Sequence, residues 1–70
     1  MNINKALDKE YETKPLKELV NAPVAALEGV SEKDAQLLKE AFNIKTIGDL
    51  GTNKFFLRAQ AIVALASTEE

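Results

Sequence analysis

The chain has 70 residues, nine of them basic and eleven acidic, for a formal net charge of −2. It contains no cysteine, histidine or tryptophan, which excludes disulfides, thiolate metal sites and a histidine general base. A chain of this length forms one domain at most and buries only about 60% of its unfolded surface.

The first segment, residues 1–13, is dense in charge. Its apolar residues lie at a helix-like spacing: Ile3, Leu7 and Tyr11. This pattern predicts a frayed helix or a flexible arm, and the segment lacks the apolar core of a signal peptide. No stretch approaches the roughly 20 apolar residues that cross a bilayer. We therefore expect a cytoplasmic protein that does not enter a membrane.

A folded domain is predicted over 14–66, with a tail at 67–70. Proline is favoured in the first turn of a helix, where its missing N–H costs nothing, so Pro15 and Pro23 each indicate a helix start. One face of the first helix is apolar at i, i+3 and i+4: Leu16, Leu19 and Val20. The second helix has a shorter apolar edge: Val24 and Leu27.

Gly29 marks a reversal of the chain, because glycine adopts a positive φ without steric cost. The next helix is predicted over 31–42. Ser31 is a favourable N-cap for it, and Asp34 in its first turn interacts well with the positive end of the helix dipole.

Two more helices follow this one. Asn43 is expected as a left-handed C-cap, and Ile44 then folds back as an apolar plug. Thr46 and Asp49 repeat the cap pattern for a short helix that ends at Gly51.

The last helix is predicted over 54–66, capped by Thr52 or Asn53. Between Phe55 and Ala66 it has only two polar residues: Arg58 and Gln60. A helix that is apolar nearly all round is normally buried by its neighbours, which predicts a central helix on which the rest packs. The alternative is an exposed face that contacts a partner or a second copy, with these candidate residues: Phe56, Arg58, Val63 and Ala64.

No segment shows strand alternation, so the predicted fold class is all-α: a compact bundle of four to five short helices. Residues 27–50 resemble helix-hairpin-helix domains, especially the C-terminal domain of the bacterial RNA polymerase alpha subunit and small uncharacterised helix-hairpin-helix proteins. The resemblance rests on these features: Gly29-Val30-Ser31, Ala35, Leu38 and the phrase 43–50. It implies that the bundle is built around a helix-hairpin-helix motif.

The resemblance also implies binding of the DNA backbone, since hairpin N–H groups and the following helix N-terminus attract a phosphate in that family. The candidate contacts are Gly29, Val30, Ser31, Lys33, Gln36, Lys39 and Lys45. Ser31 stands where the family usually has a second glycine, and Glu28 and Glu32 flank the turn. A hairpin that only joins two packed helices is therefore the alternative.

A catalytic role is not expected, and neither is a cofactor or a metal site. The carboxylates near the hairpin lack the spacing of calcium-binding loops, and Ser31 has no histidine to activate it. The sequence favours a small interaction module that contacts another protein or a second copy of itself. Double-stranded DNA is the second hypothesis for its partner.

Overall fold

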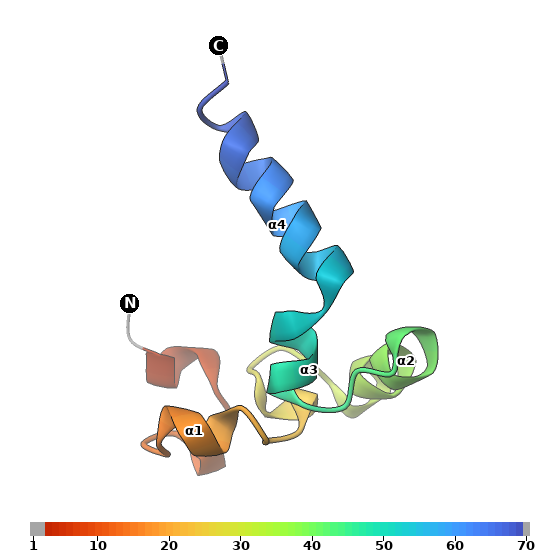
Figure 1. Ribbon diagram of the computed structural model, residues 1–70. Coiled ribbons are helices and arrows are strands. Elements are labelled where there is room, and N and C mark those ends of the chain that lie inside the picture. Colours follow the sequence, from red (N-terminus) through yellow and green to blue (C-terminus); the bar gives the residue numbers. More distant parts are fainter. Residues whose placement is uncertain (1–2, 70) are drawn as a thin grey trace.

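The computed structural model describes residues 3–69 (Figure 1). The α-helices in this range are α1 (Leu16–Leu19), α2 (Glu32–Phe42), α3 (Ile47–Thr52) and α4 (Lys54–Ala66). The 3-10 helices are η1 (Ile3–Ala6), η2 (Lys9–Tyr11) and η3 (Val24–Ala26). No strand forms in the described part of the chain, which confirms the all-α class.

The N-terminal segment lies against the loop that precedes α2. Leu7 is buried. The Asp8 N–H donates to the Ala26 carbonyl at 2.9 Å, and the Glu28 N–H donates to the Ala6 carbonyl at 2.8 Å. These bonds satisfy backbone groups of two irregular segments, which would otherwise lack partners away from water.

Helix α1 is a single turn that begins directly after Pro15, near the predicted start. Leu19 is buried, but Leu16 and Val20 of the same predicted face are 66% and 50% exposed. Both line an apolar hollow of about 170 Å³ beside Ile47. They stay accessible because this hollow is open to solvent.

The helix predicted to start at Pro23 forms only the 3-10 turn η3. Val24 and Ala26 are buried within it. The backbone becomes extended at Leu27, with ψ of 129°, so three residues are all that remain helical. Gly29 has a φ of 97°, as its predicted reversal requires. A single turn, not a helix, therefore precedes the hairpin.

The core centres on Ile44 and Val24, which are 2% and 1% exposed. Asn43 ends α2 in the left-handed conformation, with φ of 57°, and this turns Ile44 inward as predicted. The Val24 N–H donates to the Lys45 carbonyl at 3.0 Å, which joins η3 to the chain after α2. The buried apolar side chains of the described residues are Leu7, Leu19, Ala22, Val24, Ala26 and Ile44.

Helix α3 is capped as predicted. The Thr46 Oγ1 accepts the Asp49 N–H at 3.0 Å, and the Asp49 Oδ2 accepts the N–H groups of Lys45 and Thr46 at 3.0 and 3.1 Å. The hydrogen bond from the Lys45 N–H, followed by the one from the Thr46 N–H, holds the pKa of Asp49 below its ordinary value. The helix ends at Thr52, one residue beyond the predicted Gly51.

Helix α4 has the predicted bounds, but it is not central. Figure 1 shows it projecting from the rest of the molecule, and every one of its residues is exposed. The radius of gyration is 13.6 Å, against about 11 Å for a compact chain of this length. The predicted burial of this helix is wrong, and the compact bundle built around a helix-hairpin-helix motif is not confirmed. Asn53 alone links α3 to α4, whereas helices that fold back on each other need about 2 to 8 linking residues.

Candidate interaction surfaces

Two backbone donors of the hairpin bond to other groups of the chain. Ser31 caps α2 as predicted: its Oγ accepts the Asp34 N–H at 3.0 Å, and its own N–H donates to the Asp34 Oδ2 at 3.4 Å. The Val30 N–H donates to the Leu27 carbonyl at 3.1 Å. A phosphate held at a helix start depends on free N–H groups of this kind. At two of the predicted contacts, the N–H is already engaged.

One side of the hairpin is acidic. Glu28 precedes Gly29, and a hydrogen bond with Asp8, together with the negative charge of Asp8, raises the pKa of Glu28. A raised pKa shows that a second negative charge is disfavoured where these carboxyl groups meet. A phosphate placed there would add a further negative charge to this pair of carboxyl groups.

The predicted DNA contacts separate into two groups. Gln36, Lys39 and Lys45 line one hollow of about 280 Å³ between η3 and α2. Val24 and Ile44 of the core also line it. The other predicted contacts are not part of its lining: Gly29, Val30, Ser31 and Lys33. The structure thus brings three polar side chains together beside the hairpin. The hairpin turn does not line this hollow.

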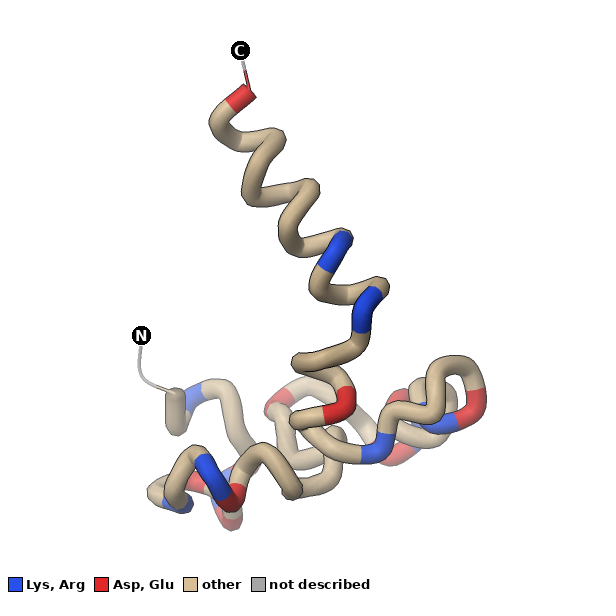
Figure 2. The backbone as a smooth tube through the Cα atoms, in the orientation of Figure 1, with Lys and Arg blue, Asp and Glu red and all other residues tan. Residues whose placement is uncertain are grey.

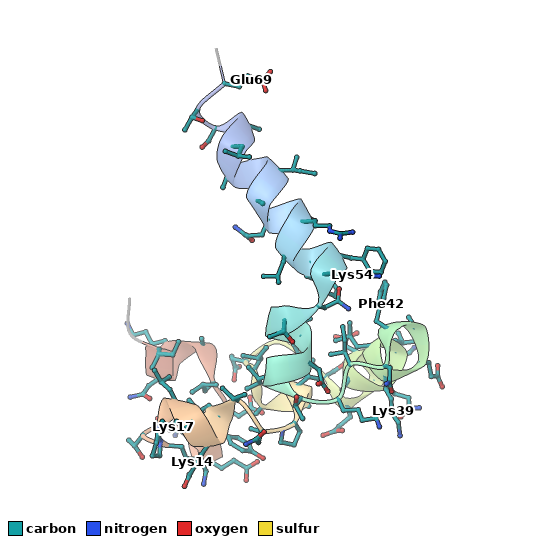
Figure 3. The ribbon with its side chains drawn as sticks, viewed as in Figure 1. Lys14, Lys17, Lys39, Phe42, Lys54 and Glu69 are labelled. Carbon is teal, nitrogen blue, oxygen red and sulfur yellow. The ribbon has the colours of Figure 1, made fainter. Side chains whose placement is uncertain are left out.

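Positive charge is not concentrated on one face. Glu32 lines the same hollow as Lys39, and Figure 2 shows acidic and basic positions interspersed over the body of the molecule. Lys14 and Lys17 lie at the opposite end of the body from Lys39 (Figure 3). The long-range field that attracts a nucleic-acid backbone needs basic residues gathered on one side.

Helix α4 carries more exposed large apolar side chains than any other element of residues 3–69. Of the eleven in this range, six belong to it: Phe55, Phe56, Leu57, Ile62, Val63 and Leu65. The residues predicted for a partner contact are all exposed as well: Phe56, Arg58, Val63 and Ala64.

One feature of α4 was not predicted from its sequence. Phe55, Ala59, Ile62 and Ala66 follow one another at intervals of four, three and four residues. This is the spacing by which paired helices keep one apolar line in contact, and we call these residues the α4 seam. The prediction of a buried central helix gave no reason to distinguish one side of α4 from another, although the spacing was present.

The base of α4 is joined to α2 by phenylalanines. The ring centroid of Phe42 lies 6.1 Å from that of Phe55 and 5.7 Å from that of Phe56, the latter edge to face. Figure 3 shows Phe42 between α2 and the base of α4. Phe42 also lines an apolar hollow of about 370 Å³ on α2, together with Leu37 and Leu38. The apolar surface therefore continues from α4 onto α2.

Among residues 3–69, none of the helices has both the length and the apolarity to cross a bilayer. In the same range, no three His, Cys, Asp or Glu residues gather as metal ligands would. Comparison with protein-family models, with curated proteins and with solved structures finds no match for this chain.

Proposed function

We propose that this chain is a non-enzymatic interaction module that contacts another protein chain through α4. The observation that carries the proposal is the exposure of apolar side chains along the projecting part of the helix. Ile62, Val63 and Leu65 are 67%, 67% and 70% exposed. Soluble monomers rarely expose apolar patches above a few hundred Å², and larger ones mark interaction sites.

The N-terminal capping of α4 supports the same proposal. The Asn53 Oδ1 accepts the N–H groups of Phe55 and Phe56 at 2.9 and 3.3 Å, and the Phe42 contacts anchor its first turn. The helix is therefore formed before any partner arrives. A preformed apolar helix binds with a smaller loss of conformational entropy than a segment that must first fold.

Photo-crosslinking in cells tests the proposal. Benzoylphenylalanine replaces Val63 on α4, and in a matched variant it replaces Lys17 on α1. We expect a protein adduct from position 63 that position 17 does not give. No adduct at 63, or the same adducts from both positions, would contradict the proposal.

The second candidate is sequence-independent binding of the DNA backbone at residues 29–33. The gathering of Gln36, Lys39 and Lys45 beside the hairpin favours it. The test is fluorescence anisotropy with a short duplex at low salt. Binding that weakens steeply with salt, and is lost in Lys39→Gln/Lys45→Gln, would support it.

The matched control for the DNA test is Lys14→Gln/Lys17→Gln, which removes the same charge at the other end of the body (Figure 3). Equal losses in both double variants would reflect net charge alone. No binding at low salt rules this second candidate out.

A further inference from the structure

The exposed surface of α4 is complementary to itself. Resting on the protein-contact function above, we infer that the partner is a second copy of this chain. The two copies pair through α4 in antiparallel orientation, with the α4 seam between the helices. Area, charge and side-chain size each support this arrangement.

The exposed area of the chain is larger than that of a compact monomer. It is 5669 Å², whereas a compact monomer of 7.7 kDa exposes about 4,300 Å². The difference is about 1,400 Å² per chain, so the fold of a single chain leaves uncovered a surface that a compact fold would bury.

The charges of α4 determine the orientation. Residues 59–68 carry no charge, Lys54 and Arg58 precede them, and Glu69 follows. Figure 2 shows basic positions at the base of α4 and an acidic one beyond its far end. An antiparallel pair brings the basic base of each copy near Glu69 of the other. A parallel pair would place like charges side by side, which is unfavourable.

The sizes of the side chains select one face of α4. At about 100° per residue, Val63 and Leu65 flank the seam on its two sides, next to Ile62. The opposite side of the same turns is small or polar: Gln60, Ala61 and Ala64. The projecting part of the helix thus has one face suited to burial and one suited to water.

Antiparallel pairing about a two-fold axis near Ile62 and Val63 places Ala59 of each copy opposite Ala66 of the other. These small side chains let the two backbones approach closely. Because α4 projects away from the body (Figure 1), this orientation places the two bodies at opposite ends of the pair of helices.

Engineered cysteines test the orientation, since the native chain contains none. We expect Ala59→Cys mixed with Ala66→Cys to form a mixed disulfide under mild oxidation. Each variant alone stays unlinked, because its two engineered cysteines, one on each copy, lie about 10 Å apart along the helix axis. A disulfide needs Cα atoms about 4.4 to 6.8 Å apart. Gln60→Cys, on the opposite side of α4, is the unlinked control.

Analytical ultracentrifugation tests the pairing itself, over chain concentrations from about 1 μM to about 1 mM. We expect the mass of two chains for the native protein. Ile62→Glu raises the dissociation constant by about 100-fold, since it buries a charge in the seam. Gln60→Glu adds the same charge outside the seam and changes the dissociation constant by less than about threefold. Ile62 is 67% exposed in the single chain, so circular dichroism of Ile62→Glu remains native.

Two outcomes overturn the inference. A native chain that keeps the mass of one copy at the highest concentration rules out the pair. Self-linked Ala59→Cys and self-linked Ala66→Cys would instead show a parallel pair. If the chain is monomeric while position 63 still crosslinks a different protein, self-pairing fails and the protein-contact function stands.

Discussion

Replacement of Gly48 by alanine probes the packing of α3, from which α4 projects. A Cβ at this position would lie 2.8 Å from the Val20 Cγ1 and 2.9 Å from the Val20 carbonyl oxygen. That oxygen also accepts the Gly48 N–H at 2.8 Å. The two backbones can therefore relieve the clash only by lengthening this hydrogen bond. We expect Gly48→Ala to lower the free energy of unfolding by about 1 to 3 kcal/mol, as overpacking in a well-packed site does.

Thermal unfolding followed by far-ultraviolet circular dichroism measures this loss, with all variants at one chain concentration because pairing makes Tm concentration-dependent. The loss corresponds to a decrease in Tm of about 5 to 20 °C for a domain of this size. Gly51→Ala is the matched control within α3. A Cβ added at Gly51 would meet nothing within 4 Å, and alanine favours a helix over glycine by about 0.5 to 1 kcal/mol. A Gly48→Ala variant that melts at or above the native Tm would refute the close approach of α3 to Val20.

Three further predictions concern single side chains. Phe42→Ala removes both ring contacts to α4 and, at 46% exposure, lowers the free energy of unfolding by about 1 to 2 kcal/mol. Hydrogen exchange of the first α4 turn then accelerates, whereas Leu37→Ala, which breaks no ring contact, leaves it unchanged. Asp49 has a lowered pKa in the fold, so its stabilisation is present above the ordinary value of 3.8 and is lost as pH falls through the lower folded value. A urea midpoint measured against pH therefore falls more steeply on the acid side for the native chain than for Asp49→Asn, and parallel curves would contradict this. Ser31→Ala removes the cap of α2 and costs about 1 kcal/mol, whereas Ser31→Gly costs a few tenths; equal urea midpoints for the two variants would contradict a capping role for the hydroxyl.

The helix caps were predictable because they are local. Ser31 and Asp34 are three residues apart, and each bonds the backbone of the other. Thr46 and Asp49 repeat this arrangement. Such bonds depend on residue type and spacing alone, so the sequence specifies them without knowledge of the rest of the fold.

The hollow beside the hairpin was not predictable in the same way. Lys39 and Lys45 come together there because the Val24 N–H bonds the Lys45 carbonyl at 3.0 Å. That bond joins segments about 20 residues apart in the chain, and no spacing rule connects them. The reduction of the Pro23 segment to one turn has a similar origin. The hydrogen bonds from the Val24 N–H to the Lys45 carbonyl and from the Glu28 N–H to the Ala6 carbonyl hold this segment at both ends. They outweigh its helical propensity.

The prediction for α4 failed for a different reason, and the failure supports the paired arrangement. A helix that is apolar nearly all round is normally buried. This rule requires that the helix be covered, but it does not require that the same chain cover it. The described chain leaves Ile62 and Val63 two-thirds exposed. A second α4 laid along the seam would cover both and leave Gln60 and Ala64 in water. The rule would then hold for the pair of chains, and the single-residue link at Asn53 would explain why α4 is covered by a partner and not by its own body.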